Sequence, residues 1–201
     1  MGAVFSALKA DTINGLQLDA GVILTNLSES EIEAFDNSKI AAKIKSKDCL
    51  GATKGGAQFS AVPEVRSLFD GVDGARGAYK QGEIIDSWEI TLKTTITELT
   101  AKNIERVVNA TQTAKGSSYK AVVGEVGMIN NKHFKNIAWV GNCAGGDKPM
   151  IIYLKDVINT NGVNFTAEDK NTGTIEVEFK AHFDLAKPDE VPFAIYTAIA
   201  G

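Results

Sequence analysis

The chain of 201 residues contains only two cysteines and two histidines, and this scarcity excludes several kinds of site. Cys49 and Cys143 stand far apart in the sequence, as do His133 and His182, so no spacing typical of a zinc site is present. Two cysteines predict no disulfide framework, and we expect both thiols to pack as small apolar side chains. We therefore expect no metal and no other cofactor.

An excess of basic residues is also missing. Lys and Arg total 21 against 25 Asp and Glu, which gives a formal net charge of −4 at pH 7. A protein that binds nucleic-acid phosphates normally carries a basic excess or stripe, so the composition argues against such binding. No apolar run reaches the roughly 18–20 residues that a membrane span needs. The first eleven residues lack a basic segment followed by a long apolar stretch, so we expect no secretory signal.

The motifs of common catalytic sites are absent as well. Neither histidine belongs to a Gly-x-Ser-x-Gly or Cys/His pattern, and we expect both at the surface. The glycine-rich stretches 51–56 and 70–77 lack the features of a phosphate-binding loop. Glu176 and Glu178 have the spacing of paired carboxylates, but solvated strand faces show the same spacing. We expect no catalytic residues and no enzyme activity.

What the sequence does contain is extended structure. Its 44% of hydrophobic residues can bury a core in one domain of this length. Residues 87–98 and 174–184 alternate between apolar and polar side chains, which predicts strands with one face on a core and the other in water. The side chains expected in the core, beneath a helix, are Trp88, Ile90, Leu92, Ile175, Val177, Phe179 and Phe183.

Further strands are predicted over residues 20–26, 56–66, 119–126, 136–143, 149–155 and 192–199. Pro63 cannot donate a ladder hydrogen bond, so it places the centre of its strand at a sheet edge or a bulge. A turn at Gly145-Gly146-Asp147 is expected to join two of these strands into a hairpin.

Helical patterns are fewer. Residues 101–111 carry an apolar stripe at helical spacing after Thr100, which is a good N-cap. A second helical stretch is predicted over 28–42, within an inserted segment 28–45, with Ser28 or Ser30 as its cap. The fold class is thus mainly β, a β-sandwich or barrel with one packed α-helix.

Residues 66–82 form a glycine-rich connection between two strongly predicted strands. A compact domain rarely uses about seventeen residues in this way without a function for them. The segment also carries apolar side chains that a solvated loop does not need, namely Leu68, Phe69, Val72 and Tyr79. We expect a long arm that is mobile in the free subunit and buried between neighbouring subunits.

The order of these features resembles the tail tube, or major tail, proteins of tailed bacteriophages and phage-like contractile particles. The first lumen strand and arm of such proteins match Gly55-Gly56-Ala57, Phe59, Pro63, Arg66 and Asp70-Gly71. Lys80-Gln81-Gly82, residues 88–99 and the stretch 100–104 match the following strand and helix. Residues 136–141 and 148–155 match the central hairpin, and 175–184 with 192–196 match the ending.

This resemblance implies one tail tube domain over residues 1–201, with a β-hairpin arm at 66–82. Six copies would form a ring with one continuous inner β-barrel, and stacked rings would form the tube that conducts DNA into the host. The expected partners are further copies, the tape-measure protein, the tail terminator, baseplate or distal tail proteins and, in a contractile tail, a sheath. DNA would pass in transit without specific binding. The expected location is the tail of the virion, and the host cytoplasm during assembly.

The resemblance also implies which residues lie at the channel wall and which join subunits. The polar faces of the two clearest strands supply candidates for the channel wall, which are Glu89, Lys93, Glu176, Glu178 and Lys180. The residues expected to join subunits through the arm are Arg66, Leu68, Phe69, Asp70, Val72, Asp73 and Tyr79. An acidic wall would repel phosphates and keep DNA from adhering.

Two other interpretations stay open. A monomeric β-sandwich of carbohydrate-binding or adhesin type would account for the strands and for Trp88 and Trp139. It predicts secretion and an exposed aromatic platform, whereas both tryptophans fall on apolar strand faces or runs. A small β-rich hydrolase is the third interpretation, although no nucleophile and base can be identified.

Overall fold

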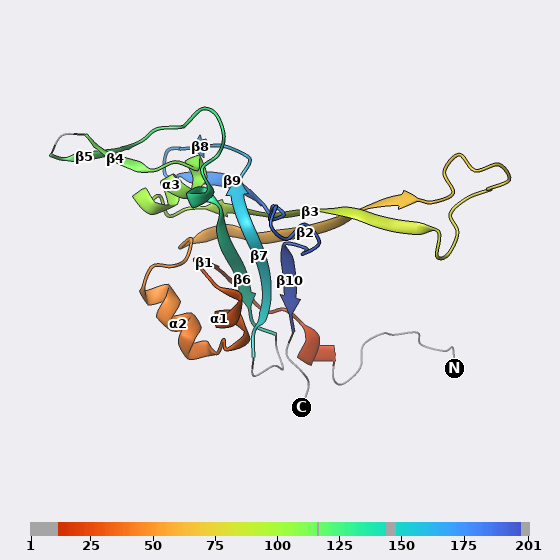
Figure 1. The fold of residues 1–201 in the computed structure, drawn as a ribbon. Helices are drawn as coiled ribbons and strands as arrows, with labels where there is room; N and C mark the ends of the chain where they lie inside the picture. Colours follow the sequence, from red (N-terminus) through yellow and green to blue (C-terminus); the bar gives the residue numbers. More distant parts are fainter. Residues whose placement is uncertain (1–11, 116, 144–147, 198–201) are drawn as a thin grey trace.

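A computed structural model describes residues 12–115, 117–143 and 148–197, and these residues are mainly β, as predicted (Figure 1). The strands are β1 (Val22–Thr25), β2 (Thr53–Ser67), β3 (Glu83–Ile96), β4 (Gln112–Lys115), β5 (Tyr119–Val122), β6 (Lys135–Gly141), β7 (Met150–Asn159), β8 (Asn164–Thr166), β9 (Thr174–Lys180) and β10 (Phe193–Tyr196). The α-helices are α1 (Glu29–Glu33), α2 (Asn37–Lys45) and α3 (Ala101–Val108). Two short 3₁₀ turns are η1 (Thr12–Gly15) and η2 (Asn131–His133).

A large antiparallel sheet organises the chain, in the order β1-β6-β7-β9-β3-β2. β10 pairs with β7, and β8 pairs with β9. β7 belongs to two halves of this sheet: it pairs with β6 and β10 along most of its length, and with β9 at Ile158 and Asn159. Asp156 lies where the β6–β7 register shifts, between Leu154 and Val157, and has a positive φ of 48°, an uncommon backbone conformation for a residue other than glycine.

The main core lies between the two halves of the sheet. β3 and β9 contribute Ile90, Leu92, Ile96, Ile175, Val177 and Phe179, and the other half contributes Ile23, Ile137, Ile152 and Leu154. Leu92 faces Phe179 and Ile96 faces Ile175 in the strand register, so the alternation predicted for these strands is confirmed. This arrangement of two packed sheet halves is consistent with a β-sandwich.

Two of the predicted core residues need correction. Phe183 is 36% exposed, because β9 ends at Lys180 and the chain then leaves the sheet. Trp88 is half-buried rather than buried, since β3 leaves the body of the protein at this point. Its ring packs on Phe193 of β10, with ring centroids 5.5 Å apart.

Helices α1 and α2 cover the other face of the half formed by β1, β6, β7 and β10. Leu24, Ala138 and Tyr153 on these strands form a second buried cluster with Ile32 and Phe35. The predicted helical stretch 28–42 is thus two helices, and α2 extends to Lys45. The expected cap is Ser28, which forms a capping box with Glu31, while Asp36 caps α2. The fold therefore has three layers. Helices α1 and α2 form the first, the sheet half with β1, β6, β7 and β10 forms the second, and the sheet half with β2, β3 and β9 forms the third.

Helix α3 begins after Thr100, as predicted, but ends at Val108 because Asn109 adopts the left-handed conformation, with φ of 53°. Two buried asparagines anchor it. The Asn103 amide donates to the carbonyls of Leu50 and Glu98, and the Asn159 amide donates to the carbonyl of Val107. Val107 of α3 reaches the main core.

Strand boundaries show what local patterns can and cannot predict. β2 is an edge strand with a register shift after Glu64, which confirms the expectation for Pro63. β6 and β7 pair as predicted, although the turn expected at Gly145-Gly146-Asp147 lies outside the described residues. β7 continues to Asn159, β5 ends at Val122, and β4 and β8 were not predicted.

Candidate functional site

The outer face of β2, β3 and β9 is polar and exposed to solvent. In the strand register Lys93 lies between Gln58 of β2 and Glu178 of β9, and Thr91 faces Lys180. All five predicted wall residues, Glu89, Lys93, Glu176, Glu178 and Lys180, belong to this face and are exposed or half-buried. The opposite face of the same strands forms the core, so one side of this sheet half meets the protein interior and the other meets water.

Charges on this polar face are largely paired across strands. Lys93 Nζ lies 3.2 Å from Glu178 Oε1, and Lys180 Nζ lies 3.0 Å from Glu89 Oε1. Glu176 faces Thr95 and forms no ion pair within the described residues. Together with Lys54 and Glu64 of β2, which face Thr95 and Ser87, four carboxylates and three ammonium groups leave one negative charge on the face.

Removing the unpaired charge should leave stability almost unchanged. For Glu176→Gln we expect a change within about 0.5 kcal/mol in the free energy of unfolding, as is usual for exposed sites. Glu178→Gln also loses the ion pair with Lys93, which in an exposed setting contributes at most about 1 kcal/mol. Chemical denaturation measures both variants. A loss of several kcal/mol for Glu176→Gln would mean that this face is buried.

The β2–β3 hairpin continues beyond the body as a two-stranded arm (Figure 1). Its strands pair from Val62 and Glu89 out to Ser67 and Glu83, with a register shift between Glu64 and Val65. The arm carries apolar side chains that are all at least 40% exposed, namely Val62, Val65, Ile84 and Ile85. Isolated two-stranded ribbons have marginal stability in water, so exposed apolar groups on one indicate a surface that another molecule covers.

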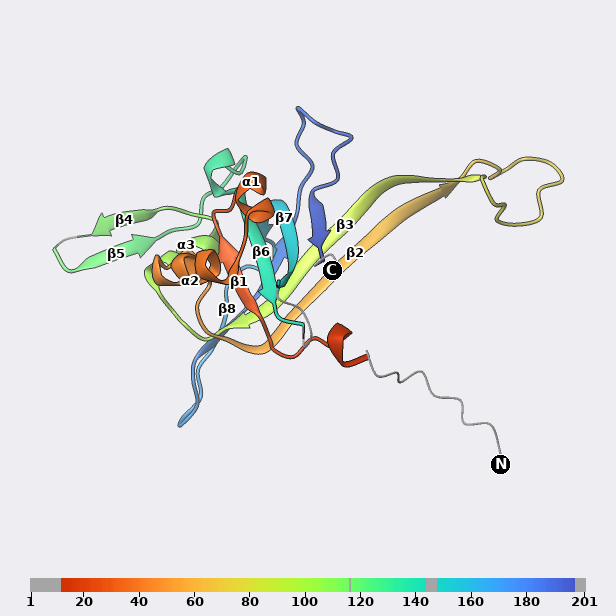
Figure 2. The same ribbon diagram turned by 90° about the horizontal axis from the view of Figure 1, so that it is seen from below.

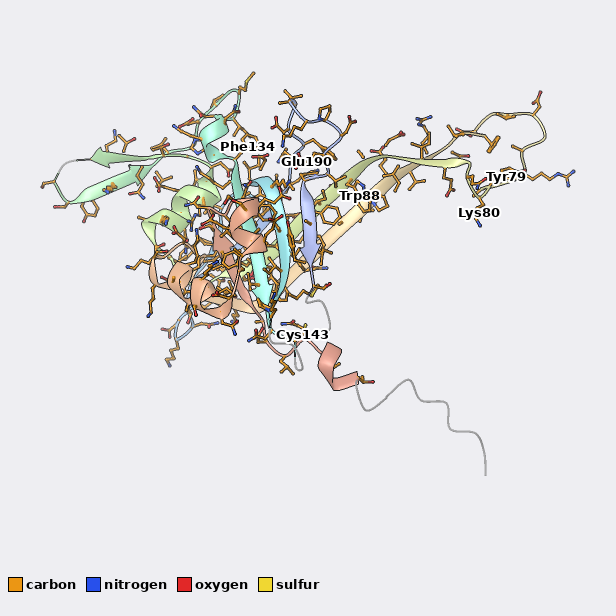
Figure 3. All side chains as sticks on the ribbon, turned by 60° about the horizontal axis from the view of Figure 1, so that its bottom comes forward. Tyr79, Lys80, Trp88, Phe134, Cys143 and Glu190 are labelled. Atoms are coloured by element: carbon orange, nitrogen blue, oxygen red, sulfur yellow. The ribbon has the colours of Figure 1, made fainter. Side chains whose placement is uncertain are left out.

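The connection at the end of the arm is shorter than predicted, because Arg66 and Ser67 belong to β2 and β3 begins at Glu83. Local contacts organise it. Leu68 N donates to Gly82 O over 2.7 Å, and the rings of Phe69 and Tyr79 meet edge to face at 5.3 Å. Figure 3 shows Tyr79 and Lys80 at this far end and Trp88 at the base of the arm. Leu68, Phe69, Val72 and Tyr79 all remain exposed.

A bidentate ion pair joins the two strands of the arm just before its end. Arg66 Nε lies 2.7 Å from Asp86 Oδ2, and a second guanidinium nitrogen lies 3.1 Å from Asp86 Oδ1. These hydrogen bonds lower the pKa of the Asp86 carboxyl. Arg66, predicted to join subunits, therefore has a partner within its own chain.

A second hairpin, β4–β5, projects from the opposite side of the body in both ribbon views (Figures 1 and 2). Tyr119 on β5 is exposed, and Val126 and Met128 in the loop that follows are fully exposed. The predicted strand 119–126 contains β5, but sequence reasoning missed its partner β4, which has only four residues. The turn-forming triplet Gly116-Ser117-Ser118 is the signal that could have indicated it.

The densest network of titratable groups lies away from the polar face, around Lys155 of β7. Its ammonium group contacts Glu29 of α1 and Glu190 of the segment before β10. Hydrogen bonds from Lys155 and Lys187 lower the pKa of Glu190 to about 2. Burial alone would lower the pKa of Lys155, but its hydrogen bonds to Glu190 and Glu29 raise it. The network fastens α1 and the segment before β10 to the sheet.

One of the two histidines does not lie where the sequence predicts. His182 is half-buried, and its Nδ1 lies 3.2 Å from the Asp156 carbonyl oxygen. The side chain of His133 is only 9% exposed, so its predicted place at the surface is wrong. Within residues 12–197, apart from the undescribed positions, no group of three or more His, Cys, Asp or Glu could hold a metal ion. In the same residues no helix is long and apolar enough to cross a membrane.

No protein-family model matches the chain, and no curated protein matches its sequence significantly. Its function must therefore be inferred from the two surfaces just described, the polar sheet face and the arm.

Proposed function

We propose that this chain is a tail tube protein, whose hexameric rings stack into the tube that conducts DNA and holds the tape-measure protein. The observation that carries the proposal is the outer face of β2, β3 and β9, where five charged side chains point to solvent from strands that are apolar on the other side. Such a sheet suits the wall of a water-filled channel. In a barrel that encloses water the inner face of the strands is polar, and the outer face can pack on the rest of the protein.

The edges of this sheet half support closure between copies. β2 pairs only with β3, and β8 pairs only with β9, in the part of the chain that the structure describes. Each edge strand has unpaired backbone N–H and C=O groups, which are templates for another strand. Joining the β2 edge of one copy to the β8 side of the next would extend the sheet around a ring and remove these edges.

The charge of the polar face agrees with a channel for DNA. Two ion pairs neutralise Glu89, Lys93, Glu178 and Lys180, and the remaining charges of the face, on Glu64, Glu176 and Lys54, leave one net negative charge per copy. Repeated around a ring, this charge repels phosphates, so DNA would slide rather than bind.

The exposed apolar groups of the arm support assembly through it. A single copy leaves Leu68, Phe69, Val72 and Tyr79 in water, although each would be stabilised by burial. Contact with a neighbouring copy would provide that burial and offset the entropy lost on ordering the segment.

A carbohydrate-binding module is the alternative, and the tryptophans do not favour it. Trp88 packs on Phe193, and Trp139 Nε1 donates a hydrogen bond to the Ala20 carbonyl over 2.9 Å. Both side chains are half-buried, so neither presents the flat exposed ring that stacks on a sugar.

Negative-stain electron microscopy of the purified protein, over a range of concentrations, tests the proposal. We expect rings and tubes with a central channel and sixfold end views. Light scattering after gel filtration gives the mass of the species. Small monodisperse particles of monomer mass at every concentration would contradict the proposal.

A further inference from the structure

A basic hollow of about 320 Å³ lies between α3, η2 and the start of β4. Its lining includes Lys102, Arg106, Lys132 and Lys135, together with His133, against the single carboxylate of Glu105. Glu105 already accepts a hydrogen bond from the backbone N–H of Gln112, over 2.8 Å. Sequence reasoning missed this cluster, because its residues come from three separate segments.

Several groups in the hollow have no partner of their own. His133 Nε2 is buried without a hydrogen-bond partner, and Glu125 Oε2 lies 4.0 Å from it. Lys132 and Lys135 are exposed, and their ammonium groups form no ion pair among the residues that the structure describes. By contrast Lys102 pairs with Asp48 at 3.1 Å. A surplus of positive charge beside a buried, unpartnered nitrogen is a site for an anion.

Two carboxylates, on Asp70 and Asp73, lie at the end of the arm. Val72 N donates to Phe69 O and Ala75 N donates to Val72 O, which closes two successive turns. The third residue of each turn is a glycine with positive φ, 74° at Gly71 and 86° at Gly74, as type II turns require. Asp70 and Asp73 therefore occupy the same position in two consecutive turns. Residues 68–75 carry no basic side chain, and the two carboxylates form no ion pair in the described chain.

These two features lie at opposite ends of the molecule. Figures 1 and 2 show the arm extending from one side of the body, and α3 with β4–β5 on the other. The end of the arm thus cannot reach the hollow of its own chain, and contact between them requires a second copy in head-to-tail orientation. The strands of a closed barrel run at about 35–45° to its axis, so an arm that prolongs two wall strands leaves the plane of its own ring.

We propose that the double turn of residues 69–75 docks in the basic hollow of a second copy, with Asp70 and Asp73 facing Lys132, Lys135 and His133. This inference rests on the proposed function, because it names the surface that receives the arm. Complementary charge would fix which end of one copy meets which end of the next.

Charge reversal tests the docking. Lys132→Glu/Lys135→Glu and Asp70→Lys/Asp73→Lys each place like charges in contact, so we expect at least a tenfold loss of sedimentable tubes. All four sites are exposed, so thermal unfolding should match the wild type. The quadruple variant, with both signs exchanged, should recover tubes. As a matched control, Lys115→Glu/Lys120→Glu makes the same change of charge on the β4–β5 hairpin outside the hollow, and should assemble normally.

A second measurement reports proximity directly. Under mild oxidation the double variant Asp73→Cys/Lys135→Cys should give a ladder of linked oligomers in assembled samples, whereas each single variant should not. Failure of both the rescue and the ladder, in a protein that forms tubes, overturns the docking while the proposed function stands. A wild type that forms no tubes contradicts the proposed function itself. If the hollow variants assemble normally but the Lys132→Glu/Lys135→Glu monomer loses affinity for inorganic phosphate, the hollow binds small anions and the docking is overturned.

Discussion

Replacing residues 70–80 by a short Gly-Ser turn is expected to leave a folded monomer that forms no tubes. The replaced residues lie beyond the last paired positions of the hairpin, Ser67 and Glu83, so the strand register is kept. The main core also contains no residue of the replaced stretch. The change removes Val72 and Tyr79, both exposed, and with them much of the apolar surface that a neighbour would cover. Stability should therefore change little while assembly is lost.

Gel filtration shows whether the shortened variant is a soluble monomer, and negative-stain microscopy shows whether it forms tubes. Hydrogen exchange adds the mechanism: amides of residues 68–82, at the end of the arm, should exchange faster in monomers than in tubes. Gly77→Ala is a matched control within the same segment, because its added Cβ meets no atom within 4 Å and it should assemble as the wild type does. Normal tubes from the shortened variant would show that the arm does not join subunits.

The parts of this fold that a sequence predicts are those that local side-chain patterns determine. A period of two marks both faces of β3 and β9, since core and water lie on opposite sides of the same strands. For the same reason the five wall candidates fall on one face. The caps at Ser28 and Thr100 were also predictable, because the cap and the backbone N–H that it accepts from are three residues apart.

Long-range partners account for what the sequence does not predict. Asn159 holds α3 through the Val107 carbonyl, 52 positions away, and no local pattern distinguishes it from a loop asparagine. The two roles of β7 depend on pairing with strands on either side. The basic hollow is likewise not predictable from local sequence, because Lys102 and Lys132 are 30 positions apart and line one hollow only in the folded chain.

Phe179→Ala is expected to lower the free energy of unfolding by about 3–5 kcal/mol, the usual cost of truncating a buried phenylalanine. Phe179 is 3% exposed and lies in register between Leu92 of β3 and Asn159 of β7, where the two halves of the sheet meet. A cavity there removes packing from both halves at once, because residues of both belong to the same core cluster.

Phe183→Ala provides the matched control for this prediction. It is the same substitution four residues further along, but at a side chain that is 36% exposed, so its cost should be under about 1 kcal/mol. Urea denaturation of the two variants gives both changes in the free energy of unfolding. The dependence of that free energy on urea concentration should keep the wild-type slope. A cost below about 1 kcal/mol for Phe179→Ala would mean that the two faces of β9 are reversed. Glu176 and Glu178 would then line the interior, and the polar face could not form the wall of a channel.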